Sequence, residues 1–223
     1  MNRFSAIILG AGSGDRMGGI DKILTEIAGL PSVLHSVNAF LEVGRFETTI
    51  VLANTENVGQ LKYLTSGPEY QSVEVVLGGI RRQDSVKIGL GQIKSSDFVM
   101  IHDGARPCVS SALIRRAITE SENTDAAIPV VPINDTVKMV DASVVTSTVD
   151  RSSLYASQTP QVFRYKTISE LHRKLTFEVT DDASVAEIYG VEVSTFEGDP
   201  ENIKMTTPLD MEIAEIILKR RNT

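Results

Sequence analysis

Five short runs rich in Val and Ile alternate with segments of helical periodicity, and this alternation limits the possible folds more than any other feature. The runs are AIIL (6–9), TIVLA (49–53), VEVVL (73–77), FVMIH (98–102) and AAIPVV (126–131). Between them, segments 31–43, 83–93 and 110–121 repeat apolar residues at the spacing of one helix face. Nearly continuous apolar strands are typical of parallel sheets that helices cover on both faces. We therefore predict an α/β fold with a Rossmann-like, mostly parallel sheet.

The second half of the chain contains a segment that alternates polar and apolar residues. Thr136–Val140 and Val144–Val149 flank a turn candidate at Asp141–Ser143, which predicts a β-hairpin. The hairpin is too polar for a core, so we expect it to project as an arm. A projecting hairpin is only marginally stable alone, and packing against a second copy of the chain would stabilise it.

Composition sets the broad class. Of the 223 residues, 42% are hydrophobic and 23% charged, and no apolar run approaches the ~20 residues of a membrane span. The formal charge is −7, and no basic patch is visible beyond KRR at 219–221, which argues against nucleic-acid binding. One cysteine, Cys108, excludes an internal disulfide and favours the cytoplasm. Without repeats or linkers, we predict one domain, 1–223, with a dimerisation arm at about 134–152.

Ligands of such sheets bind beyond the carboxyl ends of the strands, and the first loop there is LGAGSGDRMGGIDK (9–22). Its glycines include Gly10, Gly12 and Gly14. Glycines let the backbone approach a ligand closely, and exposed amides can meet anionic oxygens. The loop lacks the Lys-Ser/Thr ending of a Walker loop, and its third glycine comes one place too early for a dinucleotide fingerprint. Arg16 and Lys22 suit a triphosphate; a plain strand-to-helix turn is the alternative.

Two further loops follow apolar strands. In GGIRRQDSV (78–86), Gly79 could present backbone groups to a base and Ser85 could bind a pyrimidine edge, although a simple Gly-Gly turn before a helix explains them equally well. In HDGARP (102–107), Asp103 could accept sugar hydroxyls or water on Mg²⁺, and Arg106 could pair with phosphate or with Asp103. A single histidine at a strand end is more often structural, so we assign His102 no chemical role.

Taken together, these motifs resemble those of the nucleoside-triphosphate sugar nucleotidyltransferases, whose first loop reads G-x-G-x-R-M and then Pro-Lys. Here Asp21 stands where that proline is usual. The order and spacing of the motifs are similar to those of the 2-C-methyl-D-erythritol 4-phosphate cytidylyltransferases over essentially the whole chain. Besides the first loop, the motifs are GGIRRQDSV (78–86), HDGARP (102–107), DTVK (135–138), TVDR (148–151), QTPQVF (158–163), TDDAS (180–184) and ENIKMTTPLDM (201–211).

The resemblance implies an enzyme that transfers a cytidylyl group from CTP to 2-C-methyl-D-erythritol 4-phosphate and releases pyrophosphate, in the non-mevalonate route to isoprenoid precursors. It assigns catalytic roles to four cations: Arg16 and Lys22 at the α-phosphate, and Arg151 and Lys204 on the attacking phosphate. The residues it assigns to CTP binding are Gly10, Ala11, Gly12, Gly14, Gly79, Ser85 and Ala105. Those it assigns to the alcohol phosphate are Asp103, Arg106, Thr136 and Thr159.

The same resemblance implies a cofactor and a partner. Mg²⁺ would accompany CTP, and because it prefers phosphate oxygens and water we name no direct protein ligand; Asp103, through water, is the best candidate. The resemblance also implies a homodimer in which the arm of one subunit, with Thr136 and Arg151, reaches into the partner's site. The active site would then be composite.

Three alternatives stay open at this point. A ribitol-5-phosphate cytidylyltransferase shares the loop and the tail motif, but such enzymes tend to have Ala-Val where this chain has Gly104-Ala105. A nucleotide-binding module without transfer activity would not need all four cations. A nicotinamide-dependent oxidoreductase is disfavoured by the broken G-x-G-x-x-G pattern.

Overall fold

The computed structural model describes residues 2–12 and 21–221. In the main sheet the strands are β1 (Phe4–Gly10), β4 (Phe46–Ala53), β5 (Val73–Leu77), β6 (Phe98–Asp103), β7 (Ala126–Pro132), β10 (Tyr155–Ser157), β11 (Gln161–Arg164) and β12 (Ser194–Glu197). Two small hairpins comprise β2 (Glu26–Ile27) with β3 (Leu30–Pro31), and β8 (Lys138–Asp141) with β9 (Val144–Thr148). The helices are α1 (Ser32–Val43), α2 (Val58–Leu64), α3 (Arg82–Gln92), α4 (Ser111–Glu120), α5 (Tyr165–Lys174), α6 (Asp182–Ile188) and α7 (Pro208–Arg221), with short 3-10 turns η2 (Pro68–Tyr70) and η3 (Arg151–Ser153).

The central sheet is mostly parallel, as the apolar runs predict. Its strands lie in the order β10-β7-β11-β6-β1-β4-β5, and β12 pairs with β7. β1 pairs in parallel with both β4 and β6, β4 with β5, and β7 with β12. β11 runs antiparallel between β6 and β7, and β10 is antiparallel to β7. All five predicted strands and all three predicted helices are confirmed.

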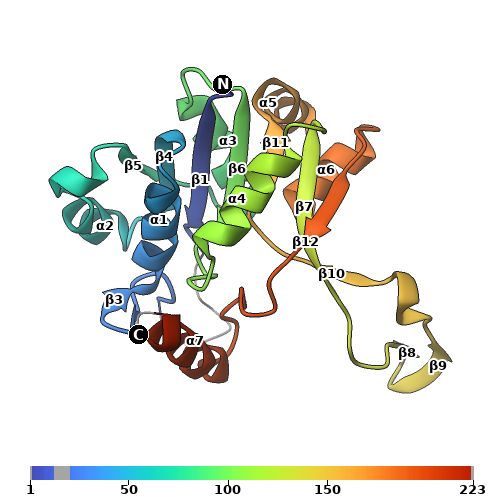
Figure 1. Ribbon diagram of the computed structural model, residues 1–223. Helices are drawn as coiled ribbons and strands as arrows, with labels where there is room; N and C mark the ends of the chain where they lie inside the picture. The colour runs from blue at the N-terminus through green and yellow to red at the C-terminus, as the bar shows by residue number, and fades with distance from the viewer. Residues whose placement is uncertain (1, 13–20, 222–223) are drawn as a thin grey trace.

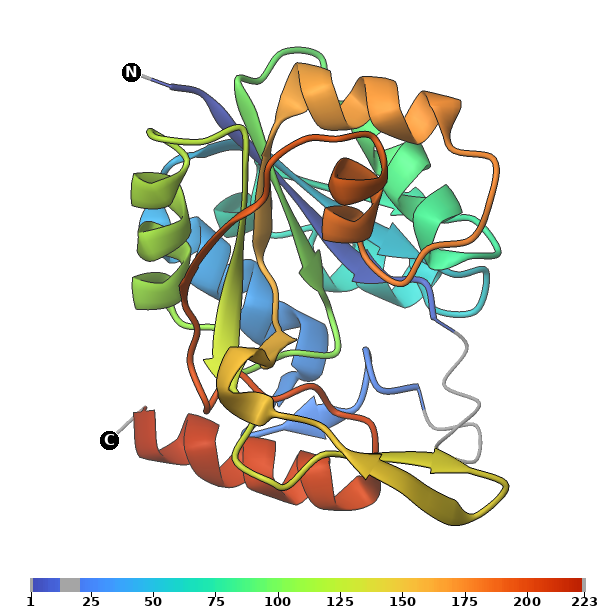
Figure 2. The same cartoon turned by 90° about the vertical axis from the view of Figure 1, so that its right-hand side faces the viewer.

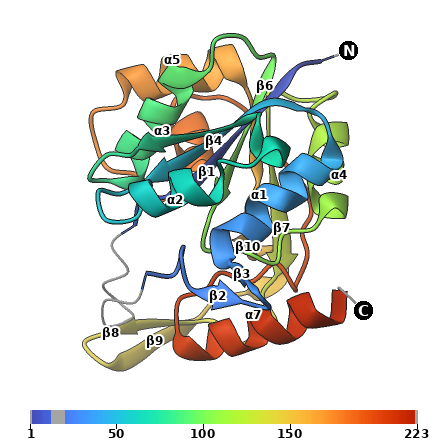
Figure 3. The ribbon, with the colours of Figure 1, turned by 90° about the vertical axis from the view of Figure 1, so that its left-hand side faces the viewer.

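Helices cover both faces of the sheet (Figures 1 and 3). Because side chains alternate along a strand, Ala6 and Ile8 of β1 pack toward α1, α2 and α4, whereas Ile7 packs toward α3, α5 and α6. Each layer contains a large hydrophobic cluster, which explains why the central strands read as nearly continuous hydrophobic runs. Among the described residues, no helix is both long enough and apolar enough to cross a lipid bilayer.

Helix α7 lies across the end of the molecule where the β1 and β6 strands terminate (Figure 2). Its start is capped on both sides: Asp210 N donates to Thr207 Oγ1 at 3.3 Å, and Thr207 N donates to Asp210 Oδ2 at 2.7 Å. These two bonds form a reciprocal capping box, which fits the T-x-x-D spacing from Thr207 to Asp210. Ala214, Ile217 and Leu218 bury one face of the helix against Ile27 and Cys108.

The predicted arm is present as the β8–β9 hairpin, which extends away from the body (Figures 1 and 2). Lys138–Asp141 pair antiparallel with Val144–Thr148, and the turn residues Ala142 and Ser143 have φ values of 44° and 69°. Two consecutive positive φ angles give the twist that a two-residue hairpin needs. Met139, Val140, Val144 and Val145 are more than half exposed, so the arm leaves an apolar surface uncovered within this chain.

Candidate active site

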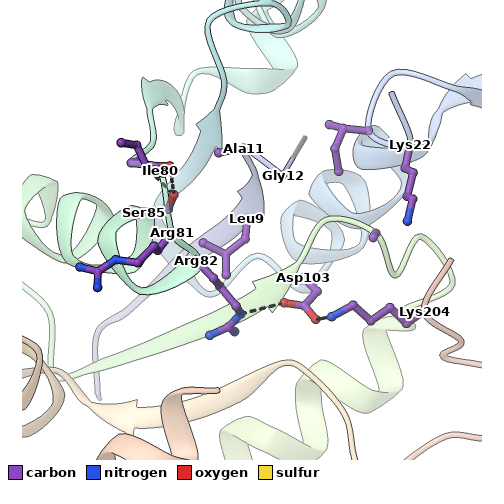
Figure 4. Close-up of a pocket in the computed structure, with 13 residues that line it drawn as sticks. Leu9, Ala11, Gly12, Lys22, Ile80, Arg81, Arg82, Ser85, Asp103 and Lys204 are labelled. Atoms are coloured by element: carbon purple, nitrogen blue, oxygen red, sulfur yellow. Dashed lines mark hydrogen bonds and ion pairs between the residues drawn. The ribbon is translucent and has the colours of Figure 1, made fainter. Parts of the chain in front are cut away.

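Two clefts open beside each other at the carboxyl ends of β1 and β6. The first has a volume of about 330 Å³ and is lined by Leu9, Ala11, Gly12, Lys22, Ile23, Gly79, Ile80, Arg81, Ser85 and Ala105. The second, of about 280 Å³, is lined by Arg106, Ser157, Gln158, Thr159, Gln161, Thr180 and Asp181. Arg82, Asp103 and Lys204 line both clefts and form the wall between them. Figure 4 shows Lys22 on the far side of the first cleft from Arg82.

Asp103, the last residue of β6, is the centre of this shared wall. Its Oδ2 accepts from Lys204 Nζ at 2.7 Å, and its Oδ1 lies 3.4 Å from Arg82 Nε (Figure 4). Arg106 Nε lies 4.0 Å from Oδ2. Burial alone would raise the pKa of Asp103, but Arg82 and Lys204 outweigh burial and hold it well below its usual range. Asp103 is therefore ionised and holds two cations at the seam of the clefts.

Thr159 and His102 support Asp103 from behind. Asp103 N donates to Thr159 Oγ1 at 3.1 Å, and that hydroxyl lies 3.0 Å from His102 Nδ1. Arg106 O, 3.2 Å from His102 Nε2, can only accept, so Nε2 carries the ring proton and Nδ1 of the neutral ring accepts from the Thr159 hydroxyl. Burial lowers the pKa of His102 to about 4. His102 is a neutral, structural histidine, and Thr159 holds the Asp103 backbone.

Gly79 and Ser85 form one compact turn at the base of the first cleft. Ser85 Oγ accepts from Gly79 N at 3.0 Å and is 3% exposed. A Cβ on the preceding glycine, Gly78, would lie 2.7 Å from both Ala11 Cβ and Ser85 Oγ. The turn thus needs glycine for close packing, and Ser85 has a structural contact in addition to its place on the cleft lining.

Asp21 stands where the family usually has a proline, and its side chain holds the following turn through hydrogen bonds. Its Oδ1 accepts from Ile23 N at 2.8 Å and from Leu24 N at 3.4 Å, which is a side-chain-capped turn around Lys22. Its Oδ2 accepts from Asn57 Nδ2 at 3.1 Å, and the same amide nitrogen donates to Gly10 O at 3.1 Å. Buried Asn57 therefore ties the end of β1 to the residue before Lys22.

With this geometry the chain can be compared with known proteins. It matches the family model described as 2-C-methyl-D-erythritol 4-phosphate cytidylyltransferase over residues 4–220. The chain belongs to this family. A cytidylyltransferase of that name from Shouchella clausii (strain KSM-K16) is 40% identical over 226 residues, which cover 98% of this chain and 97% of the relative. One from Geobacillus thermodenitrificans (strain NG80-2) is 40% identical and covers 98% of each chain.

Solved structures agree with the cytidylyltransferase fold. The crystal structure of 4-diphosphocytidyl-2C-methyl-D-erythritol synthase from Anaerococcus prevotii DSM 20548 has a TM-score of 0.86 at 29% identity, covering 98% of this chain and 99% of that one. The 2-C-methyl-D-erythritol 4-phosphate cytidylyltransferase from Thermus thermophilus has a TM-score of 0.80 at 26% identity, with 98% and 100% covered.

The structure brings many of the predicted residues together. The first cleft is lined by the predicted CTP residues Ala11, Gly12, Gly79, Ser85 and Ala105, together with Lys22, and the shared wall and second cleft contain Asp103, Lys204, Arg106 and Thr159. Gly10 is absent from the lining of the first cleft, and an added Cβ there would be 2.9 Å from Leu52 O, so glycine permits close packing against β4; its predicted part in CTP binding stays a prediction. Gly14 and Arg16 lie outside the described residues.

Two predicted residues lie apart from these clefts. Thr136 precedes β8, and Arg151 opens the turn η3 after β9; both are exposed and neither lines either cleft. Their placement on the arm fits the predicted composite site, in which they would serve a partner subunit.

Sequence reasoning missed Arg82, which lines both clefts. The motif GGIRRQDSV contains two adjacent arginines, and nothing local distinguishes them. In the structure Arg81 pairs with Asp84 on its own helix, whereas Arg82 points toward Asp103 (Figure 4). Gln158 was also missed; its Nε2 donates to Asp199 O at 2.9 Å and ties the segment before Lys204 to the second cleft. The only available signal was its place in the QTPQVF motif.

Proposed function

We propose that this chain transfers a cytidylyl group from CTP to 2-C-methyl-D-erythritol 4-phosphate, forming 4-diphosphocytidyl-2-C-methyl-D-erythritol and pyrophosphate. One observation carries the proposal: two clefts meet at a wall of Arg82, Asp103 and Lys204. A group transfer needs two substrates whose reacting atoms meet, and a common wall with two cations suits the junction of two phosphates. Family membership and the full-length relatives named for this activity support the choice of substrates.

The first cleft suits CTP. Lys22, Arg82 and Lys204 all line it, so three cations face the space although the chain as a whole carries −7. A phosphate monoester is already a competent nucleophile near neutral pH, so the residues need to orient the substrates and neutralise charge on the triphosphate. Lys22 and Arg16 would act at the α-phosphate, and the turn at Gly79 and Ser85 would receive the base.

The second cleft suits the alcohol phosphate. Arg106 reaches its lining with a guanidinium that is fixed by a 2.8 Å hydrogen bond from Nη1 to Asn202 O. Asp103 could accept a hydrogen bond from a substrate hydroxyl through a carboxylate lone pair that does not face Lys204. Lys204, held at 2.7 Å from Asp103, would direct the attacking phosphate toward the first cleft.

Mg²⁺ is the cofactor we infer for CTP. Both oxygens of Asp103 already face cations, at 2.7 and 3.4 Å, so direct coordination would break an ion pair and contact through water fits better. Within the described residues, no three His, Cys, Asp or Glu side chains gather to hold an ion. When bound, the ion would neutralise phosphate charge, with phosphate oxygens and water as its main ligands.

We further infer a homodimer in the cytoplasm. The arm exposes Met139, Val140, Val144 and Val145, and a second copy would cover them while bringing Thr136 and Arg151 to the partner's second cleft. A free, buried Cys108 is compatible with a reducing compartment.

A pyrophosphate-release assay tests the function. Purified protein with Mg²⁺ and CTP should release pyrophosphate with 2-C-methyl-D-erythritol 4-phosphate, and much more slowly when ribitol 5-phosphate replaces it or UTP replaces CTP. Release with ribitol 5-phosphate but none with the methylerythritol substrate would overturn the proposed acceptor. Mass spectrometry of the product would identify the cytidine diphosphate ester directly.

A further inference from the structure

A chain of polar side chains, most of them buried, leads from α5 and α6 to the wall between the clefts. His172 of α5 lies 3.0 Å from Asp182 Oδ1, and Asp182 Oδ2 lies 2.8 Å from Arg82 Nη1. Arg82 Nε then lies 3.4 Å from Asp103 Oδ1. His172 and Asp182 are 2% and 0% exposed, so neither can contact a substrate in the clefts. Arg82, whose side chain is 27% exposed, is the member that reaches them.

Asp182 is fixed in place independently of Arg82. It is the first residue of α6, and the backbone amides of Ala183 and Ser184 that follow it donate to Gln161 Oε1 and Asp181 Oδ1, each at 3.0 Å. Gln161, on β11, is itself buried. The carboxylate of Asp182 is therefore carried by a helix start that is anchored to the sheet, and it offers Arg82 a rigid partner.

The charge balance explains why this partner is needed. Asp103 Oδ2 lies 2.7 Å from Lys204 Nζ, whereas Asp103 Oδ1 lies 3.4 Å from Arg82 Nε. Because Lys204 is the closer cation, Asp103 alone would hold the Arg82 guanidinium only weakly. Burial alone would raise the pKa of Asp182, but its interactions with Arg82 and His172 together outweigh burial and lower that pKa. A buried, ionised carboxylate holds its cation closely, because no water is present to solvate its charge and Arg82 is the cation that lies against Oδ2.

We propose that Asp182, backed by His172, is a positioning residue that holds the Arg82 guanidinium at the junction of the two clefts, where it meets phosphate oxygens of the reacting substrates. The inference rests on the proposed function for the identity of those substrates. It adds Arg82 to the cations of the site and gives a role to the TDDAS motif, which lies about a hundred residues further along the chain.

A double-mutant cycle tests the proposal. Arg82→Gln removes the charge, Asp182→Asn removes its partner, and the double variant leaves no unpaired buried charge. We expect each single variant to lower kcat by about tenfold or more. In the Arg82→Gln background, Asp182→Asn should cause little further loss, because its target is gone. Asp125→Asn, which removes the carboxylate of the exposed pair with Arg164, is the matched control and should retain full kcat.

Two results would overturn the proposal. If Asp182→Asn lowers kcat equally in both backgrounds, or lowers only the melting temperature, Asp182 acts as a general structural residue. If the crystal structure of Asp182→Asn shows the Arg82 guanidinium unmoved, Asp182 does not position it. That structure needs no turnover, so the positioning role can fail or hold separately from the proposed function, which fails only if the unmodified protein releases no pyrophosphate from CTP.

Discussion

The wall between the clefts and the β8–β9 arm both carry cations predicted to act on one reaction, but the chain holds them in opposite ways. In the wall, Asp103 fixes Lys204 at 2.7 Å and Arg82 at 3.4 Å. On the arm, the exposed side chain of Arg151 makes no hydrogen bond or ion pair with the described part of the chain. One chain alone preorganises the wall, whereas in the proposed homodimer the arm would be held in place only by the partner subunit.

The largest effect is expected when a cation on the lining of the first cleft is removed. Lys22→Ala should lower kcat by about a hundredfold, because a cation aimed at the transferred phosphate acts most strongly in the transition state. The melting temperature should change little, since Lys22 lies on the cleft lining. Lys166→Ala, an exposed lysine on α5, is the control. Turnover that survives within severalfold would remove Lys22 from the transition state.

A change to a cation on the arm should give a different kinetic signature. Arg151→Ala should raise the KM for 2-C-methyl-D-erythritol 4-phosphate by about tenfold, with a smaller effect on the KM for CTP, because the guanidinium would contact only the alcohol phosphate. Initial rates with each substrate varied in turn measure both constants. An unchanged KM for the alcohol phosphate would make Arg151 a simple surface residue.

Mixing the two variants tests whether the arm works in the partner's site. In a mixed dimer of Lys22→Ala and Arg151→Ala chains, one site would combine an intact Lys22 with an intact Arg151 from the other chain. Random exchange of equal amounts should therefore restore about a quarter of wild-type activity. If the mixture after exchange is no more active than its components, both residues serve the same chain's site or the arm does not exchange.

A further prediction concerns His102, the histidine behind the wall; the arm segment 134–152 contains no histidine. Burial lowers the pKa of His102 from 6.5 to about 4, so between these values the unfolded chain binds a proton that the folded chain excludes. Its contribution to the free energy of unfolding is thus complete above pH 6.5 and is lost as the pH falls toward 4. Urea unfolding from pH 7 to 4.5 should show this decline.

The variant His102→Gln provides the reference for that titration. It cannot take up the proton, so its free energy of unfolding should fall less steeply over the same pH range. Equal slopes for the two proteins would show that other groups dominate the acid sensitivity of the wall.

Features set by nearby residues could be predicted from the sequence, whereas features set by distant partners could not. Buried strands such as Phe98–Asp103 were predictable because both faces of the sheet demand apolar residues, and the α7 start was predictable because capping is local. The insertion of β11 between β6 and β7 was not, because strand pairing depends on distant residues. Arg81 pairs with nearby Asp84, whereas Arg82 pairs with Asp103 and Asp182. A doublet of like residues carries no local trace of a partner a hundred positions away.

The smallest effect concerns Asp21, which holds the turn around Lys22 on the lining of the first cleft. Asp21→Ala removes the acceptor for Ile23 N and the link through Asn57 to Gly10. We expect a loss of about 1 kcal/mol in the free energy of unfolding, as for other side-chain caps, and a severalfold lower kcat because Lys22 is less well held. Asp21→Asn keeps an acceptor for the turn and should recover most of both. If Asp21→Ala changes stability but leaves kcat intact, the turn supports the fold without placing Lys22, and the preorganised region shrinks to the residues around Asp103.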